Sequence, residues 1–289
     1  DCVRPLPAFG LVDIKSDTGT SSYHALLLTL QRNFKNGLLF QADYSYAHSI
    51  NDGSVGGGES NAVQNASCRA CDRGPSIFDV RHNFVASAVY ELPVGPGRPY
   101  WNSGGFLGKV LEGWSLNALG VAHTGHPLTV IFSPTFAPLD GNFGPNLRPD
   151  LVPGVPIILN QSANNWINPA AFQEPPSVGG LTGSFAGTVY TRWGNAGNGI
   201  VRAPNVWQID LGLTKNTRLT ERFSLGFRAE FFNIFNHTQL ADPNLDINGS
   251  KFGVITTTVN TNNNSDHFNT SNTGPGLSRQ MQFSLRLNF

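Results

Sequence analysis

Hydrophobic and polar residues alternate strictly over the end of the chain, which reads R-Q-M-Q-F-S-L-R-L-N-F over residues 279–289. Successive side chains of a strand point to opposite faces, so every second residue of this run shares a face. One face is then wholly apolar, and its residues are Met281, Phe283, Leu285, Leu287 and Phe289. The pattern predicts a final β-strand with one apolar and one polar face, which ends on an aromatic residue.

The same alternation recurs earlier in the chain and predicts strands at residues 23–32, 38–49, 78–92, 114–120, 207–214 and 223–232. A weaker first strand is expected near residues 10–16. Lys35-Asn36-Gly37 is a tight hairpin signal between the first two strong segments. Several runs reach the ~10 residues that a tilted strand needs to cross a bilayer, whereas strands of soluble proteins average about 5–6.

Seven charged residues lie in the middle of these strands, and all fall on the polar face. They are Asp43, Arg81, Glu91, Asp210, Arg228, Glu230 and Arg286. In a membrane barrel, lipid covers the apolar face and such charges line the lumen. A soluble sandwich would instead pack its apolar faces together, and alternation alone does not separate the two folds. Strand length favours an all-β, antiparallel transmembrane β-barrel with these seven residues facing the lumen.

The connections between the strands support the same fold class. Short connections at residues 35–37 and 216–222 contrast with long ones, rich in Gly, Asn, Ser and Thr, at residues 50–76, 133–204 and 240–274. Short periplasmic turns and long extracellular loops are typical of outer-membrane barrels, and loops of this length are unusual in compact soluble domains.

Counting crossings leaves one choice open between the fifth and sixth strong segments. Either residues 127–132 do not cross the membrane, or one more outward strand lies between residues 133 and 204, with 183–193 as its expected place. The expected total is roughly eight to ten strands.

Composition and hydropathy exclude several classes of protein. Charged residues make up 13% of the chain, against roughly 25% in soluble domains. The net charge is +0, which gives no electrostatic reason to expect nucleic-acid binding. No apolar run approaches the ~18 residues of a membrane-spanning helix. No signal peptide precedes Asp1, so a signal was removed or the chain starts inside a longer protein; we favour the second.

Three cysteines are present, and Cys68 and Cys71 form a C-x-x-C pair. A zinc site needs a second pair, and a haem attachment needs His where Asp72 stands. A small loop disulfide between Cys68 and Cys71 is therefore favoured over free thiols. Cys2 is left without an assigned partner.

Nothing in the sequence indicates catalysis. The seven His residues are scattered, no G-x-S-x-G elbow occurs, the glycine run at 56–58 lacks a phosphate-binding Lys, and the Asn-rich run at 260–266 lacks the carboxylates of a calcium loop. We expect no enzyme activity, metal or cofactor. Aromatic residues of the long outer segment are candidates for ligand contact: Trp166, Phe172, Tyr190 and Trp193.

Short motifs along the chain resemble those of Oar-like TonB-dependent outer-membrane receptors. They are D-V-R-H-N-F at 79–84, Y-E-L-P at 90–93, G-W at 113–114, W-I-N-P-A-A-F at 166–172, D-L-G-L-T-K at 210–215, R-A-E-F-F-N-I-F-N-H at 228–237 and the final Phe289. Each motif is weak alone, but their order and spacing from about Tyr23 onward are specific.

The resemblance implies a large barrel of about 22 strands closed by an N-terminal plug. Residues 1–289 would be the C-terminal portion of that barrel, without the plug. The implied function is uptake of a bulky nutrient (siderophore, oligosaccharide or peptide) across the bacterial outer membrane. The implied partners are membrane lipid and lipopolysaccharide, the barrel-assembly machinery, which would act on the final strand, and TonB, which would act through the plug region.

Two other hypotheses stay open. A self-contained outer-membrane barrel could act in surface adhesion or as a small channel, since low charge and long Asn/Gly loops fit that role equally well. A soluble β-sandwich or β-rich enzyme is the third, and it predicts extraction into buffer without detergent.

Overall fold

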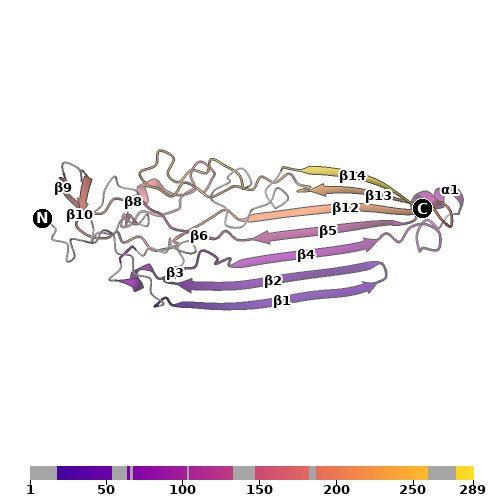
Figure 1. Ribbon diagram of the computed structural model, residues 1–289, viewed down its shortest axis with the longest axis horizontal. Coiled ribbons are helices and arrows are strands. Elements are labelled where there is room, and N and C mark those ends of the chain that lie inside the picture. The colour runs from indigo at the N-terminus through magenta and orange to yellow at the C-terminus, as the bar shows by residue number, and fades with distance from the viewer. Residues whose placement is uncertain are drawn as a thin grey trace, which may run out of the picture.

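The computed structural model describes residues 18–53, 64–65, 68–102, 104–132, 147–181, 187–259 and 278–289. Its main feature is one antiparallel sheet (Figure 1). The long strands of this sheet are β1 (Ser21–Lys35), β2 (Leu38–Asn51), β4 (His82–Glu91), β5 (Trp114–His123), β12 (Val206–Arg218), β13 (Ser224–Phe232) and β14 (Gln280–Asn288). They lie side by side in chain order, and the short β3 (Gly74–Pro75) pairs with the end of β2.

The remaining elements lie in the connections. They are η2 (Arg69–Asp72), α1 (Gly105–Leu111), β6 (Pro127–Leu128), β7 (Asp150–Leu151), η3 (Pro169–Ala171), β8 (Phe172–Gln173), β9 (Ser177–Leu181), β10 (Gly187–Tyr190) and β11 (Val201–Arg202). Short strands pair locally, β6 with β11, β7 with β8 and β9 with β10. No described helix combines the length and hydropathy needed to span a membrane.

The two ends of the sheet differ in Figure 1. One end, which we call the loop end, carries β3, β6 and β8 to β10. The other, which we call the turn end, carries α1, the C-terminus and the short turns. The β1–β2 turn is built by Asn36 and Gly37, both with positive φ (54° and 79°). This is the backbone that a two-residue hairpin with right-handed twist requires, so the predicted hairpin is confirmed.

The strand register places most large apolar residues of the seven long strands on one side of the sheet, although a few, such as Leu27 and Leu119, lie on the other. Directly opposed residues of neighbouring antiparallel strands share a face; one such row runs from Leu28 through Tyr44, Phe84 and Ala122 to Trp207. We call this side the apolar face; its large apolar residues are Leu26, Leu28, Leu30, Leu38, Phe40, Tyr44, Tyr46, Phe84, Tyr90, Trp114, Leu116, Trp207, Ile209, Leu211, Leu213, Leu225, Phe227, Phe231, Met281, Phe283, Leu285 and Leu287. Arg32 and Lys215, near the strand ends, are basic residues on the same side.

Many of these side chains have no protein cover; Leu285, for example, is 69% exposed. The largest fully buried side chains instead lie outside the long strands, and the main hydrophobic cluster is built by Leu128, Val130, Ile167, Ala171, Phe172, Val201, Ala203 and Phe252. The protein therefore buries its core in the loops and exposes apolar strand residues, the reverse of a soluble sandwich. A lipid environment accounts for both observations, and the predicted barrel fold class is confirmed.

The crossing left open by the sequence is decided by strand pairing. β5 pairs directly with β12, so residues 124–205 form one connection between neighbouring strands. Residues 127–132 do not cross, because β6 has only 2 residues and pairs with β11. The outward strand suggested at 183–193 is also wrong, since its described part, β10, pairs with β9 at the loop end.

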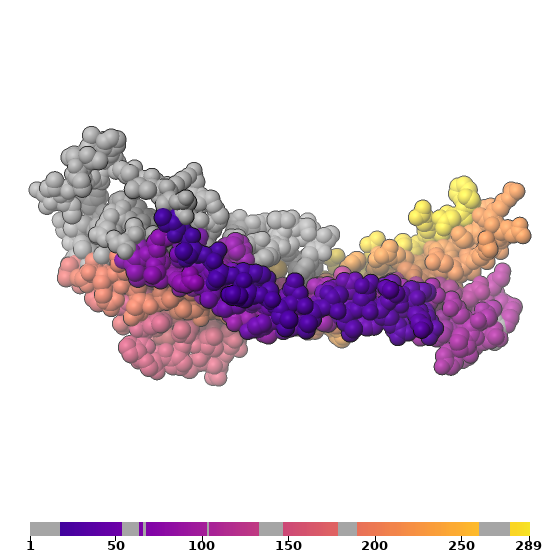
Figure 2. Space-filling model, turned by 90° about the horizontal axis from the view of Figure 1, so that it is seen from below, coloured from indigo at the N-terminus to yellow at the C-terminus, as the bar shows by residue number. Residues whose placement is uncertain are grey.

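The main sheet has eight described strands with the two-residue β3 included, and seven of them are long. Among the described residues the sheet stays open, with β1 and β14 as its edges. The weak strand expected near residues 10–16 lies outside the described residues. Figure 2 views the sheet from the side of β1, in indigo.

Arg81 is a correction to the predicted strand at 78–92. The strand begins only at His82, because the backbone before it forms local turns. In these turns the N–H of Asp79 donates to Ser76 O (2.8 Å) and the N–H of Val80 donates to Phe78 O (2.8 Å). Arg81 therefore lies at the loop end of the sheet rather than in mid-strand.

Candidate functional site

Six of the seven predicted lumen residues share the face opposite the apolar face. They are Asp43, Glu91, Asp210, Arg228, Glu230 and Arg286. Some lie opposite polar residues, such as Glu230 opposite Gln282 and Arg228 opposite Ser284, whereas Asp210 lies opposite Leu119. We call this side the polar face. That it faces the lumen remains a prediction from the barrel pattern.

Charges on the polar face are held by neighbours on the same face. Arg228 Nη2 lies 2.5 Å from Glu230 Oε1. Asp43 accepts hydrogen bonds from Thr29 Oγ1 and Gln41 Nε2, both at 2.7 Å. Such groups suit a wall that faces water or a polar partner.

Asp210 has a further role at the end of β13. Its carboxylate accepts hydrogen bonds from Gln208 Nε2 and from the backbone N–H of Asn233, both at 2.8 Å. Asn233 has a φ of 49° and turns the chain out of the sheet. The Asn233 side chain accepts a hydrogen bond from the backbone N–H of His237 and donates one to the backbone O of His237, each at 2.9 Å. Two of the motifs noted in the sequence thus meet in one local structure.

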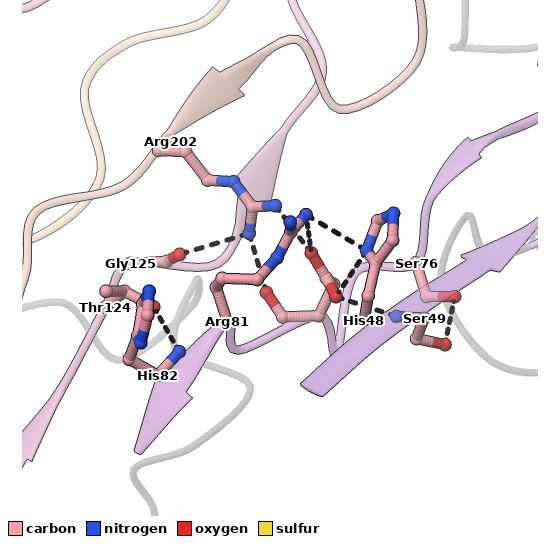
Figure 3. A network of polar contacts seen from close by, with 9 residues as sticks. His48, Ser49, Ser76, Arg81, His82, Thr124, Gly125 and Arg202 are labelled. Atoms are coloured by element: carbon pink, nitrogen blue, oxygen red, sulfur yellow. Dashed lines mark hydrogen bonds and ion pairs between the residues drawn. The ribbon is translucent and has the colours of Figure 1, made fainter. Parts of the chain in front are cut away.

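A buried carboxylate network organises the loop end (Figure 3). The Asp79 side chain is fully buried. Its carboxylate accepts hydrogen bonds from Arg202 Nη2 at 2.5 Å and from the backbone N–H of Ser49 at 2.8 Å. His48 Nδ1 lies 3.1 Å from Asp79 and 3.0 Å from Arg81 Nη2, so it donates to the carboxylate or accepts from the guanidinium, according to its tautomer.

This network joins segments that are far apart in the sequence. Arg202 Nη1 also donates to the backbone O of Asp79 (2.7 Å) and of Gly125 (3.4 Å). The end of β2, the approach to β4 and the β5–β12 connection are thereby tied to one carboxylate. Burial alone would raise the pKa of Asp79, but hydrogen bonds from Arg202, Ser49 and His48 outweigh it and hold the pKa below its ordinary value.

A second buried ion pair lies beside the disulfide. Cys68 and Cys71 are bonded, with their Cα atoms 5.4 Å apart, as the C-x-x-C spacing favoured. Arg148 forms an ion pair with the adjacent Asp72, and it also donates to Cys71 O (3.1 Å) and Ala196 O (2.8 Å). The disulfide loop and the residue that follows it therefore present a carbonyl and a carboxylate to one buried guanidinium.

The loop aromatic residues proposed as ligand contacts build the interior of the loops instead. Phe172 is 7% and Tyr190 3% exposed, so neither is available to a ligand here. Phe172 packs edge-on against Phe252, and Tyr190 against Phe132. This corrects the prediction, and the reason is that loops which pack on one another use their aromatic residues as core.

The two tryptophans of that set are partly buried. Trp166 Nε1 donates to Arg202 O at 2.8 Å and its ring packs on the main cluster. Trp193 packs against the smaller cluster of Phe132, Leu147 and Tyr190. The two tryptophans therefore pack against different clusters of the loop core.

Aromatic residues gather on the apolar face near the loop end. Tyr44 and Trp207 lie in the same row. The Tyr44 hydroxyl is hydrogen-bonded to His82 Nδ1 (2.8 Å), and the Trp207 ring lies 5.9 Å from that of Phe235. Such a belt suits the membrane–water interface. Among the described residues, no group of three or more His, Cys, Asp or Glu is placed to hold a metal.

One of three comparisons with known proteins found a match, and it agrees with the barrel fold. No curated protein and no solved structure matches the chain. A family model described as "Outer membrane beta barrel domain" matches residues 2–282, nearly the whole chain. The chain therefore belongs to this family of outer-membrane β-barrel domains, which places it in the bacterial outer membrane.

Proposed function

We propose that the chain is the C-terminal part of a TonB-dependent receptor barrel that takes up a bulky nutrient, of the siderophore, oligosaccharide or peptide class. In this role the polar face lines the lumen, the packed loops receive the ligand outside the cell, and TonB acts through a plug region. Lipopolysaccharide and the barrel-assembly machinery are the further partners proposed. The role is transport rather than catalysis.

The openness of the sheet carries this proposal. β1 ends at the Asn36-Gly37 turn and β14 ends near Phe289, so both edge strands run toward the turn end. Their direct pairing would be parallel, whereas strands of outer-membrane barrels pair antiparallel. An antiparallel barrel therefore needs an odd number of further strands between these edges. One would close a small barrel, whereas many would make a wide one, and the widest barrels are plugged transporters.

The test is uptake by the whole protein in the outer membrane, with and without TonB. We expect labelled members of one of the three nutrient classes to accumulate in cells that have TonB and not in cells that lack it. Uptake that does not depend on TonB would favour a channel. Surface binding without any uptake would favour adhesion. Either result would overturn the proposal.

The adhesion or small-channel alternative rests on a different observation. Leu159 and Val178 are exposed apolar residues of the loop assembly, and such residues suit contact with another macromolecule. Exchange of both for Ser would lower attachment of cells under the adhesion hypothesis and leave it unchanged under the transport hypothesis.

A further inference from the structure

The connection between β4 and β5, residues 92–113, stands apart from the other connections of the turn end. The β1–β2 and β12–β13 turns are short, while this segment contains α1 and projects beyond the strands at that end (Figures 1 and 2). We call it the β4–β5 segment.

This segment exposes large apolar side chains to its surroundings. They are Tyr100, Trp101, Phe106, Leu107 and Val110, with Phe106 at 82%. Trp101 also has a φ of 50°, an unusual conformation for a bulky residue, which costs backbone energy. A patch of this kind on a monomer marks a contact with an apolar partner or a membrane.

α1 is fixed to the apolar face of the barrel. Lys215 and Trp114 oppose each other in register on that face. Lys215 Nζ donates to the carbonyls of Lys109 (3.0 Å), Val110 (2.7 Å) and Glu112 (2.8 Å), and Trp114 Nε1 donates to Val110 O (2.9 Å). The last carbonyls of the helix, which would otherwise lack partners, are thus satisfied by side chains of the lipid-facing side.

The segment is held closely against its neighbours. Gly113 has a φ of +77°, and a Cβ there would come 2.1 Å from the backbone O of Asn216. Gly95 has a φ of +103°, and its Cβ would lie 2.9 Å from Glu112 Cα. Glycine is required at both positions because any side chain would push the segment away from β12 or from the end of α1.

Basic side chains outnumber acidic ones around the segment. The basic residues of the turn end outside the polar face are Arg32, Lys35, Arg98, Lys109, Lys215 and Arg222. The acidic residues of the turn end, with Glu91 of the polar face included, are Glu91, Glu112 and Glu221. Such a surface attracts anionic lipid headgroups, and each nearby Lys or Arg contributes on the order of 1 kcal/mol.

We propose that the β4–β5 segment is a membrane-surface anchor that lies in the phospholipid headgroup region at the turn end, which the barrel pattern assigns to the periplasmic leaflet. Its exposed apolar residues meet the acyl boundary and Lys109 meets the phosphates, as in interfacial helices that lie in the membrane plane. The partner of these exposed residues is phospholipid, because α1 is bonded to the apolar face, which lipid covers. The inference rests on the outer-membrane location and not on the uptake function.

Site-specific lipid quenching tests the anchor in the whole protein, reconstituted into phosphatidylethanolamine–phosphatidylglycerol nanodiscs. A bimane label is placed at Leu107→Cys in a Cys2→Ser background, which leaves the Cys68–Cys71 disulfide intact. Leu159→Cys, of similar exposure (58% against 66%), is the matched control at the loop end. Leu285→Cys, on the apolar face, is the positive control.

We expect headgroup-linked nitroxide lipid to quench the label at 107 at least twofold, and the label at 285 to be quenched by acyl-linked nitroxide. The label at 159 should keep its emission with both. Quenching of the label at 107 as weak as that at 159, while the label at 285 is quenched, would overturn the anchor proposal and leave the uptake proposal unaffected. Retained heat-modifiability of each labelled protein shows that it is folded.

Discussion

Asp79 joins several segments at the loop end through one buried carboxylate. A fully buried carboxylate is tolerated only with strong partners, and this one has the guanidinium groups of Arg202 and, at 3.5 Å, Arg81. Because these partners come from different connections, loss of the charge would loosen several loops at once.

Asp79→Asn is therefore expected to open the loop assembly. The substitution keeps the shape but removes a charge-assisted hydrogen bond to Arg202, which costs about 2 kcal/mol. Hydrogen exchange in residues 196–204 should accelerate roughly tenfold or more. Glu221→Gln, an exposed substitution at the turn end, serves as the control and should leave exchange in the loops unchanged.

The same carboxylate predicts a pH dependence. Its folded pKa is lower than the ordinary value, which is about 3.9 in the unfolded chain. The stability that it contributes is complete above that value and is lost as the pH falls through the lower folded value. The arginines around it stay charged throughout.

We expect pepsin to cleave the loop assembly of the parent protein increasingly as the pH is lowered from 4 toward 2, after correction for the activity of pepsin on an unfolded substrate. Asp79→Asn should be cleaved readily over the whole range and should lack this dependence. An identical pH profile for both proteins would argue against a role for Asp79.

At the scale of the element, β14 tests which face of the sheet meets lipid. Phe283 lies on the apolar face opposite Ala229, and its neighbour Gln282 lies on the polar face opposite Glu230. Arg on the lipid face of a barrel costs about 2–4 kcal/mol near the bilayer midplane, whereas Gln282→Arg would face the carboxylate of Glu230.

We expect Phe283→Arg to lower the free energy of unfolding by about 2 kcal/mol or more, and Gln282→Arg to have little effect. Urea titration of the protein in phospholipid bilayers, followed by Trp fluorescence, measures both. Equal losses for the two variants would contradict the assignment of the faces.

The disulfide loop is the second element with a measurable contribution. Closing so short a loop removes chain entropy equivalent to about 2 kcal/mol. Paired replacement of Cys68 and Cys71 by Ser should therefore increase exchange in residues 68–72, and the Arg148–Asp72 ion pair should limit the effect to that region. Cys2→Ser is the control, and loss of the whole fold in the paired variant would exceed what this entropy explains.

At the scale of the whole molecule, the open sheet predicts that β1 and β14 are not neighbours in the membrane. A disulfide requires Cα atoms within about 7 Å. Leu28→Cys paired in turn with Met281→Cys, Phe283→Cys or Leu285→Cys should give no cross-link under mild oxidation. Leu28→Cys with Tyr44→Cys, which are directly opposed, should cross-link, and a β1–β14 cross-link would contradict the open sheet.

Much of the sheet could be predicted from the sequence, because alternation across a strand is a local property of the backbone. Strand positions, the Asn36-Gly37 hairpin and the two faces of β14 follow from residues that are adjacent in the chain. Arg81 was misplaced for a related reason, since an alternating run continued through a turn whose hydrogen bonds the pattern does not encode.

The alternation of residues along the chain is enough to predict long amphipathic strands suited to the outer membrane. It does not predict which residues form the loop core, that Asp79 meets Arg202 across 123 positions of sequence, or that Lys215 fixes α1 to the apolar face. The physical reason is range: side-chain direction within a strand is set by neighbouring residues, whereas burial and charge pairing in the loops depend on contacts that form only when distant segments pack together.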